Sequence, residues 1–552
     1  VDEAHCISDW GHDFRPDYRR LVSILKLMPV NVPVLGTTAT ANDRVIADIQ
    51  SQLGDFVIQR GPLMRDSISL QTITMPDQQS RLAWLAQHVP DLPGTGIVYV
   101  LTKKDADRVA KWLNQNGITA QAYYSGVKHP DYETSDEYRM VLEEKLLQNQ
   151  IKALVATTAL GMGYDKPDIG FVIHYQCPGS VIAYYQQVGR AGRALDKSYG
   201  ILMTGQEDAD IQEFFRKSAF PGEEKVRNIL KVLGEHDGIR LSALEREINM
   251  PQGKLKAALK YLSVESPSPV LKEKQYYYRT PVFWQMDTQK IKRLTNQRVI
   301  EWQEIQGYMN QTGCLMKFLA DSLDDHTAGD CGKCMNCRND RIIPEDVDYG
   351  LTVSATRFIK QSEMELNLMV QTAPDAFPVY GFKGNLPTEL RAETGRVLSR
   401  WNDPGWGKLV ADGKHRNHFN HELVEAIWEM ITQRWKPDPF PEWIACVTSL
   451  NHTELVPDFA RRLSAHSGLP FRSVIHKVKT NDPQKLQLNR FHRCNNLDGV
   501  FRIEGPLSST PVFLLDDIVD SRWTLTVVSA LLRQNGSGPV YPLALATSES
   551  GG

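Results

Sequence analysis

Short apolar runs at three places in the chain predict buried strands. Gly96–Val100 is apolar throughout, and Leu154–Gly163 begins as an apolar run and then breaks into a loop of small residues. A third run, Val512–Leu515, lies near the end of the chain. Unbroken apolar runs are typical of parallel strands that are covered on both faces. With a helical stretch at 105–116, the pattern predicts an α/β protein built on parallel sheets.

Apolar positions three and four residues apart predict helices between residues 222 and 283. One helix carries Val226, Ile229, Leu230 and Leu233, and another carries Leu255, Ala258, Leu259 and Leu262. Pro251 suits the start of the second helix, and Val270–Thr280 reads as a hairpin. Helices followed by a hairpin are typical of a winged-helix module. The alternative, a solvated helical insertion, stays open.

The chain starts with the string Asp2-Glu3-Ala4-His5. In nucleic-acid-dependent ATPases the Asp of such a string orients the magnesium ion, and the Glu positions the attacking water. These enzymes grip phosphates with a second string, G-x-x-x-x-G-K-[ST], which does not occur in the 552 residues. We therefore expect negligible ATP turnover from this sequence by itself. An N-terminal truncation of a larger motor would explain the pattern.

Two further groups of residues predict contacts with DNA. Trp10 and Phe14 could stack on bases of any identity, and Arg15 could contact a phosphate. Thr157 and Thr158 begin a loop of small residues, where hydroxyls and backbone amides can approach phosphates closely.

The string Gln186-Gln187-Val188-Gly189-Arg190-Ala191-Gly192-Arg193 places two arginines beside glycines. A guanidinium stays charged and can contact two phosphate oxygens at once, which suits the charge of a phosphoryl-transfer transition state. Arg190 and Arg193 are therefore candidate catalytic residues, with Gln186 beside them.

Asp2 to His5, the loop from Trp10 to Arg15, Thr38–Ala41 and the arginine string closely resemble the motifs of RecQ-family DNA helicases of superfamily 2, in the family's order. The resemblance implies two RecA-like motor domains, ATP and Mg²⁺ as cofactors, and 3′-to-5′ unwinding at single-strand–duplex junctions of DNA. Gln187 departs from it, because many members carry Glu there.

Four of the eight cysteines have the spacing of a metal site: Cys314, Cys331, Cys334 and Cys337. Two-residue spacing lets neighbouring thiolates converge on one tetrahedral Zn²⁺, and four thiolates leave no open coordination position. The spacing predicts a structural zinc, and it also resembles the RecQ zinc-binding subdomain. Free thiols or disulfides are the alternative.

Lys254, Lys256 and Lys260 fall on the polar face of the second helix predicted between 222 and 283. They are candidates for binding duplex phosphates, while the hairpin could separate strands. Ordinary exposed lysines are the alternative.

The segment Val512–Leu525 contains a strand, paired carboxylates, a polar loop and a helix starting at about Thr524. It resembles the phosphoribosyl-pyrophosphate (PRPP) motif of type I phosphoribosyltransferases, in the competence-associated ComF branch. The resemblance implies that Asp516 and Asp517 hold ribose hydroxyls, and that Ser521 and Thr524 surround the 5′-phosphate. Arg522 stands where the family has Gly and Asp520 replaces a common Thr. A scaffold without activity is the alternative.

The composition adds few constraints. The net charge is −3 and 41% of residues are hydrophobic, so any DNA-binding surface must be local. No apolar run is long enough for a membrane span, and the unpaired thiols indicate a reducing cytoplasm.

The order of the motifs predicts six segments: a first-motor remnant at 1–62, a second RecA-like domain at 63–215, a winged helix at 222–283, a zinc-binding helical subdomain at 284–345, a linker at 346–375 and a phosphoribosyltransferase-like domain at 376–552. Residues 1–60 hold too few strands for a core of their own. They should be disordered, pack on the second motor domain or self-associate. The predicted function is a DNA helicase, and the alternative is a PRPP-dependent enzyme or sensor on a DNA-binding platform.

Overall fold

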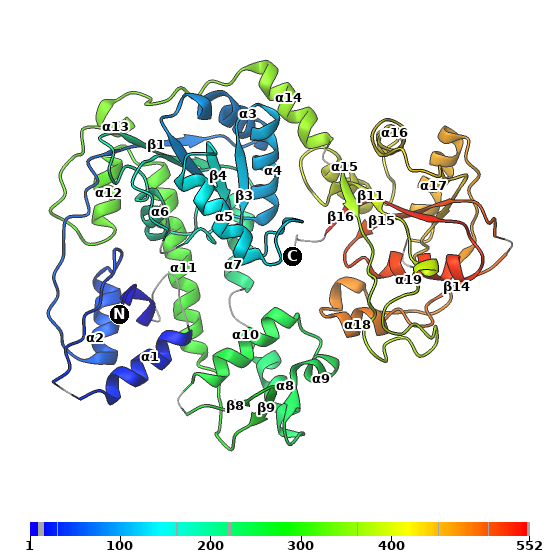
Figure 1. The fold of residues 1–552 in the computed structure, drawn as a ribbon, viewed down its shortest axis with the longest axis horizontal. Coiled ribbons are helices and arrows are strands. Elements are labelled where there is room, and N and C mark those ends of the chain that lie inside the picture. Colours follow the sequence, from blue (N-terminus) through cyan, green and yellow to red (C-terminus); the bar gives the residue numbers. More distant parts are fainter. Residues whose placement is uncertain are drawn as a thin grey trace. The chain divides into compact units, whose positions relative to one another are not determined.

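The computed structural model describes residues 1–8, 16–29, 31–161, 164–218, 222–265, 267–361, 363–450, 452–505 and 507–548. Trp10, Phe14 and Arg15 lie outside the described residues. The chain divides into two compact units (Figure 1). The first unit comprises residues 1–226, 258–271 and 280–355, and the second comprises 227–257, 272–279 and 356–552.

A six-stranded parallel sheet forms the centre of the first unit. Its strand order is β1-β6-β5-β2-β4-β3. The bounds are β1 Ile68–Thr74, β2 Thr95–Tyr99, β3 Ala120–Tyr123, β4 Ala153–Ala156, β5 Ile169–His174 and β6 Ser198–Thr204. Every residue of β2 and β4 is buried, which confirms the strands expected from the apolar runs.

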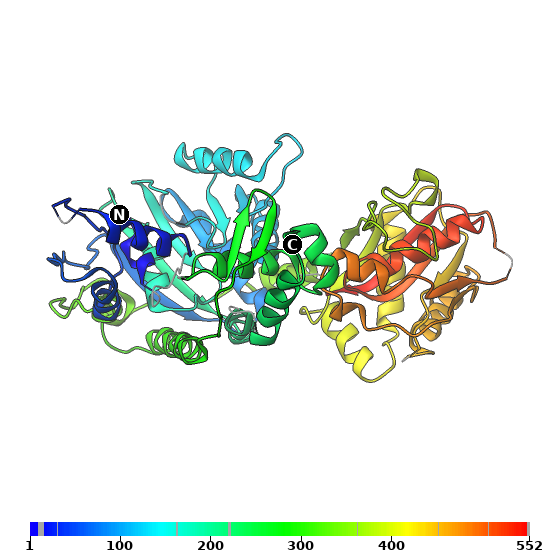
Figure 2. The same cartoon turned by 90° about the horizontal axis from the view of Figure 1, so that it is seen from below.

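Helices connect these parallel strands, as crossover connections require. They are α3 Gln78–His88, α4 Lys103–Gln115, α5 Ser135–Leu147 and α6 Val181–Val188, with the short η2 Val89–Asp91 after α3. Helix α7 Asp208–Ser218 follows the last strand, β6. Helix α4 begins before the expected Asp105, because the Thr102 side chain caps it by accepting a hydrogen bond from the Asp105 N–H. Helix α5, cyan in Figure 2, lies at the outer edge of this unit.

The described part of residues 1–62 contains helices and no strand. These elements are η1 Ala4–Ile7, α1 Pro16–Leu27 and α2 Asp43–Leu53. Ile7, Val22 and Val45 form a small apolar cluster among them. The Arg44 guanidinium pairs with Glu301 at 3.1 Å. The Thr40 hydroxyl accepts from the Gln186 side chain at 2.8 Å, so this segment also contacts residues 63–215, which was one of the three expectations.

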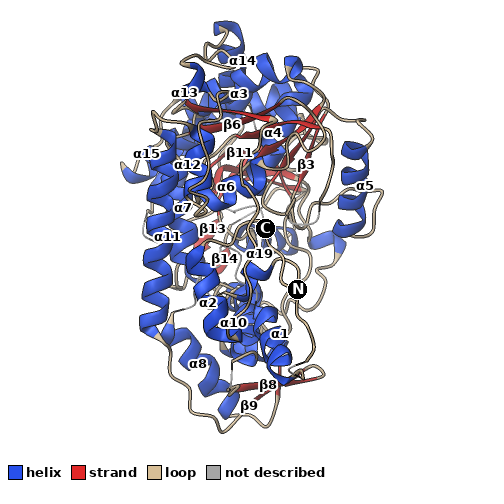
Figure 3. Ribbon diagram, turned by 90° about the vertical axis from the view of Figure 1, so that its left-hand side faces the viewer, coloured by secondary structure: helices blue, strands red, loops and turns tan. Residues whose placement is uncertain are grey.

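The cysteine-bearing segment consists of helices α11 Thr288–Met309, α12 Leu315–Asp321 and α13 Met335–Arg338. Figure 3 shows α11 as the long helix of this unit. Trp302, Ile305 and Tyr308 of α11 belong to the same hydrophobic cluster as Leu70 and Leu154 of the sheet. The helices therefore share their core with the six-stranded sheet.

Residues 223–279 contain the helices and hairpin that the apolar periodicity predicted. The elements are α8 Glu223–Gly234, β7 Ile239–Arg240, α9 Leu241–Glu247, α10 Gln252–Ser263, β8 Val270–Glu273 and β9 Tyr276–Arg279. The strands form a sheet of order β7-β9-β8. Lys254, Lys256 and Lys260 of α10 are exposed, as expected.

The second unit is built on a five-stranded sheet of order β10-β11-β16-β15-β12. The strands are β10 Met364–Leu366, β11 Gly395–Arg400, β12 Trp443–Cys446, β15 Val512–Val519 and β16 Val540–Thr547. Only β10 pairs antiparallel in this sheet. Along β15, Val512 and Leu514 join one hydrophobic cluster and Phe513 and Leu515 another. The sheet is therefore covered on both faces.

The remaining elements of the second unit surround this sheet. They are η3 Thr388–Leu390, α15 Trp406–His415, α16 Glu422–Glu429, the π-helical turn η4 Met430–Trp435, α17 Leu455–Ser467, η5 Gln484–Leu486, α18 Arg490–Asn495, α19 Trp523–Gln534 and the antiparallel pair β13 Ile475–Lys477 and β14 Phe501–Ile503. Helix α19 begins one residue before the predicted Thr524.

The predicted linker at 346–375 is more ordered than expected. It contains α14 Tyr349–Lys360 and strand β10, which pairs with β11. Three residues are too short to show strand alternation in the sequence, so the C-terminal sheet begins earlier than the prediction placed it. Among the described helices, none combines the length and apolar composition that a bilayer span requires.

Candidate functional site

The Asp2 carboxylate is exposed and held in place by two hydrogen bonds. Its Oδ1 accepts from the Thr37 hydroxyl and from the Glu3 N–H, each at 2.9 Å. These two donors lower the pKa of Asp2, so the carboxylate keeps its charge. A charged, oriented carboxylate oxygen is a suitable ligand for Mg²⁺.

Glu3 has a left-handed backbone with φ 50° and ψ 47°. Such a conformation is uncommon for a residue other than Gly and occurs often at functional sites. The Glu3 carboxylate lies 3.3 Å from His5 Nδ1. The same His5 nitrogen lies 3.0 Å from the Thr38 hydroxyl. The buried His5 therefore links the acidic string to the 37–40 segment.

The 37–40 segment also contacts the arginine string on α6. The Gln186 side chain donates from Nε2 to the Thr40 hydroxyl at 2.8 Å. The Thr40 N–H donates to the Thr38 hydroxyl at 3.3 Å. Three strings separated by up to 180 residues of sequence thus form one hydrogen-bonded network, with Thr37 as a member that the sequence did not single out.

The two candidate arginines have different surroundings. Arg190 is 8% exposed and donates to the carbonyls of Gly161 and Tyr164, each at 2.8 Å. Arg193 pairs with Asp165 at 2.6 Å, and its side chain is 42% exposed. Arg190 therefore holds the loop after β4 in place, and Arg193 is the more accessible of the two.

The predicted DNA-contacting threonines lie directly after β4, at the carboxyl edge of the sheet. Thr158 is exposed, whereas the half-buried Thr157 accepts from the Ala159 N–H at 3.3 Å. The Thr157 N–H itself donates to the Tyr123 carbonyl at 3.1 Å. Loops at this edge of a parallel sheet are the usual place for ligand contacts.

Gln187, the departure from the helicase resemblance, faces inward. It lies 2.7 Å from Nε2 of the buried His174, which stacks on Tyr99 at 5.1 Å between ring centroids. Burial lowers the pKa of His174 to about 4. The imidazole is therefore neutral at physiological pH and positions α6 through an uncharged hydrogen bond.

Because the folded-state pKa of His174 lies below its unfolded value of about 6.5, the stability it contributes is present above pH 6.5 and is lost as the pH falls toward 4. We expect His174→Phe to flatten this dependence, which amounts to about 3 kcal/mol for a fully buried group. Urea unfolding of both proteins at pH 7 and pH 4 measures the pH dependence of the free energy of unfolding. If the free energy of unfolding depends on pH equally in the wild type and in His174→Phe, His174 does not have a lowered pKa in the folded protein.

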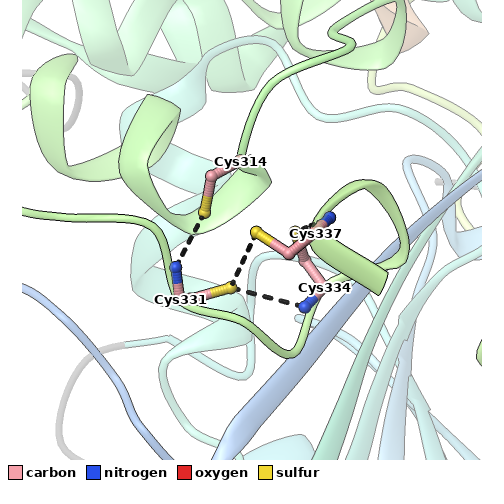
Figure 4. Close-up of side chains that lie close together, drawn as sticks. All are labelled: Cys314, Cys331, Cys334 and Cys337. Carbon is pink, nitrogen blue, oxygen red and sulfur yellow. Dashed lines mark hydrogen bonds between the residues drawn. The ribbon is translucent and has the colours of Figure 1, made fainter. Parts of the chain in front are cut away.

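The four predicted metal ligands come together in the first unit. The sulfurs of Cys314, Cys331, Cys334 and Cys337 all lie within 4.8 Å of one another. Figure 4 shows Cys314, Cys331 and Cys337 turned toward a common centre. Among the described residues this is the one group of three or more His, Cys, Asp and Glu side chains with such spacing.

Backbone N–H groups surround these sulfurs. Cys314 Sγ accepts from the N–H of Cys331 at 3.2 Å, and Cys331 Sγ accepts from the N–H of Cys334 at 3.3 Å. Cys334 Sγ accepts from the N–H of Leu315 and of Cys337, each at 3.4 Å. Hydrogen bonds to sulfur favour the thiolate that a metal requires. The donor set therefore fits a tetrahedral Zn²⁺.

The paired carboxylates of the second unit lie inside β15, which runs on to Val519 instead of ending before Asp516 as the sequence suggested. Asp516 Oδ1 accepts from the Asp517 N–H at 2.9 Å. Burial and the neighbouring Asp517 charge raise the pKa of Asp516. The Asp516 carboxyl is therefore protonated more readily than an ordinary carboxyl.

Lys414 of α15 forms an ion pair with Asp517. No sequence signal pointed to it, because about a hundred residues separate the partners. In the loop after β15, Ser521 is buried and Arg522 has a left-handed backbone with φ 62°. Left-handed backbone is the reason a glycine is usual at such a position. The Arg522 guanidinium donates to the Asn367 carbonyl at 3.1 Å.

Residues 81–195 match the helicase conserved C-terminal domain family. The chain is 29% identical over 346 residues to the probable ATP-dependent DNA helicase RecS of Bacillus subtilis, covering 61% of this chain and 65% of that protein. It is 38% identical over 214 residues to the RecQ-like DNA helicase BLM of Xenopus laevis, covering 38% of this chain and 15% of that protein.

It is also 35% identical over 236 residues to the ATP-dependent DNA helicase RecQ of Bacillus subtilis, covering 42% of this chain and 38% of that protein. The matched part thus spans less than two thirds of each of these relatives. The chain contains a helicase conserved C-terminal domain at residues 81–195, and its sequence is similar to those of RecQ-like DNA helicases.

Proposed function

We propose that the protein is a RecQ-like, ATP-dependent DNA helicase of superfamily 2 that moves 3′ to 5′ along one strand. The observation that carries the proposal is the network joining Asp2, Thr37, His5, Thr38, Thr40 and Gln186. It joins the two predicted parts of the ATP site, the hydrolytic carboxylates and the arginine string, through Thr38 and Thr40, whose segment would couple this site to bound DNA.

In this assignment each residue of the chain has a defined task. Mg²⁺-ATP, when bound, supplies the phosphoanhydride that is cleaved. Asp2 would hold the metal, Glu3 would orient the attacking water, and Arg193 would contact the transferred phosphoryl group. Arg190 would position the loop after β4, where Thr157 and Thr158 would contact DNA phosphates. Trp10, Phe14 and Arg15 remain predicted DNA contacts.

Gln186→Ala should lower DNA-stimulated ATP hydrolysis of the whole protein by roughly fivefold, since the hydrogen bond to Thr40 that it removes is worth about 1 kcal/mol. Hydrolysis without DNA should change less. Steady-state kinetics with and without single-stranded DNA measure the ratio of DNA-stimulated to unstimulated ATP hydrolysis. Gln150→Ala, which removes an exposed amide bonded only to Gln148 among the described contacts, is the matched control. An unchanged ratio would refute coupling through this network.

The proposal extends to the cysteine cluster and to residues 222–283. The cluster would hold one structural Zn²⁺, supported by its sulfur spacing and its backbone donors. Residues 222–283 would form a winged helix, supported by their helices and β-hairpin. Its exposed Lys254, Lys256 and Lys260 would bind duplex phosphates.

A second candidate function is PRPP binding by the C-terminal sheet. It is favoured by Asp516 and Asp517 near the carboxyl end of the interior strand β15, followed by a loop and helix α19. Asp516 and Asp517 would hold the ribose hydroxyls, while Ser521, Thr524 and the start of α19 would surround the 5′-phosphate. The Lys414–Asp517 ion pair must open first.

Calorimetric titration of this chain with PRPP and Mg²⁺ tests the second candidate. We expect saturable binding that Asp516→Asn/Asp517→Asn abolishes. Lys414→Met should tighten binding several-fold, because Asp517 no longer has to leave a partner. Absence of heat at millimolar PRPP in both the wild type and Lys414→Met would make this domain a scaffold without a PRPP site.

A further inference from the structure

Helix α9 is attached to the segment that precedes α18, inside the second unit. Asn249, which follows α9, donates from Nδ2 to the Leu486 carbonyl at 2.9 Å and accepts at Oδ1 from the Leu488 N–H at 2.7 Å. Paired strands donate and accept hydrogen bonds with a neighbouring backbone in the same way, but here a single side chain makes both bonds.

Asn489 forms the reverse attachment. Its Oδ1 caps α18 by accepting from the His492 N–H at 3.1 Å. Its Nδ2 donates to the carbonyls of Glu245 and Ile248 at the end of α9, each at 2.8 Å. The side chain is almost completely buried, so it joins the carboxyl end of one helix to the amino end of the other without solvent between them.

A charged contact adds to these hydrogen bonds. Arg246 of α9 pairs with Asp375 at 3.2 Å, and its guanidinium lies 5.8 Å from the centre of the Phe491 ring. Figure 1 shows α9 beside α18. The attachment therefore uses side chains from both partners and is not a single contact.

The attached segment, residues 475–493, is strongly basic. It contains one acidic residue, Asp482, whose carboxylate accepts from the Gln487 side chain at 3.4 Å. Its five lysines and arginines are Lys477, Lys479, Lys485, Arg490 and Arg493. Lys479, Lys485 and Arg490 are exposed. In a chain of net charge −3 this is a local excess of positive charge.

We propose that residues 475–493 form a second surface for DNA phosphates, which the attachment to α9 holds on the same body as Lys254 and Lys256 of α10. The inference rests on the proposed DNA binding by α10. The occupant is the duplex next to the junction, because exposed lysines and arginines complement its closely spaced phosphates and α10 would engage the same duplex.

The experiment measures the affinity of this chain for a duplex with a single-stranded tail by fluorescence anisotropy, from 50 to 200 mM salt. Lys479→Gln/Lys485→Gln/Arg490→Gln should reduce the slope of log affinity against log salt by about 0.9 for each phosphate that the segment no longer neutralises. The matched control neutralises three exposed lysines elsewhere in the unit, Lys383, Lys408 and Lys436. A basic-segment variant that keeps the wild-type slope overturns the proposal.

Asn249→Ala/Asn489→Ala tests the attachment, because it removes the hydrogen bonds without changing any charge. We expect a similar reduction of the slope from this variant, with the second unit still folded by circular dichroism. If it keeps the wild-type slope while folded, the attachment is not what places the segment. If the asparagine variant does not fold, the proposal is tested by Lys479→Gln/Lys485→Gln/Arg490→Gln.

Two comparisons separate this inference from the proposed function. The first outcome is a reduced slope in Lys254→Gln/Lys256→Gln/Lys260→Gln and a wild-type slope in the basic-segment variant. It would support the proposal that α10 binds DNA and overturn only the second surface. Wild-type slopes in both would overturn DNA binding by this whole region. If the basic-segment variant loses affinity for single-stranded DNA but not for the duplex, the assignment of the duplex as the occupant is overturned.

Discussion

Cys334→Ser should release the zinc that we propose the four cysteines hold, and lower the thermal unfolding midpoint of the first unit by roughly 10 °C or more. Cys334 is fully buried, and its sulfur lies in the same hydrophobic cluster as Leu315 and Tyr308. A serine hydroxyl does not replace a thiolate ligand, so the variant loses the metal and leaves a polar group in the core. Zinc content by mass spectrometry and calorimetric unfolding measure the two effects.

The matched control for this prediction is Cys494→Ser. Cys494 is also fully buried but lies in the second unit and belongs to a different hydrophobic cluster. It should lose stability while keeping one zinc per chain. A Cys334→Ser protein that retains stoichiometric zinc and the wild-type midpoint would show that these cysteines are ordinary thiols.

Arg193→Ala should lower the ATP turnover of the whole protein by about 10³ to 10⁵ while leaving its fold intact. The Arg193–Asp165 ion pair is exposed on both sides, and such pairs contribute about 0–1 kcal/mol to stability. The loss should therefore appear in kcat and hardly in the unfolding midpoint. A turnover within tenfold of wild type would remove Arg193 from the catalytic residues.

Arg190→Ala should behave differently, because Arg190 is buried and donates to two carbonyls. Leaving the Gly161 and Tyr164 carbonyls unpaired should cost about 1–3 kcal/mol of stability each. Asp165→Asn provides the control for the pair, since it frees Arg193 without removing it. We expect it to retain turnover. If Arg190→Ala leaves stability unchanged, its positioning role is wrong.

These two arginines show how much of the site a sequence can predict. The spacing of the arginine string identified both as candidates, because the residue types carry the chemistry. Which one is buried depends on where Gly161, Tyr164 and Asp165 lie, and these residues are about thirty positions away in the chain. Spacing within a string does not contain that information.

The sequence also did not predict the contacts between distant segments. The Lys414–Asp517 pair and the Gln186–Thr40 hydrogen bond each join residues separated by more than one hundred positions. Any lysine or glutamine in the chain is a chemically acceptable partner. Only the packing of α15 and α6 on their sheets selects these two.

The sequence by itself determined the parallel strands, the helices of residues 222–283 and the grouping of four cysteines with metal-ligand spacing. Each depends on short-range regularities: an apolar run, a period of three to four residues, or two-residue ligand spacing. The tertiary structure alone decided the network around Thr37 and Thr40, the surroundings of Arg190, the early start of the C-terminal sheet and the attachment of α9 to α18. These depend on which surfaces meet when apolar faces are buried, and that choice is made by the whole chain rather than by any local pattern.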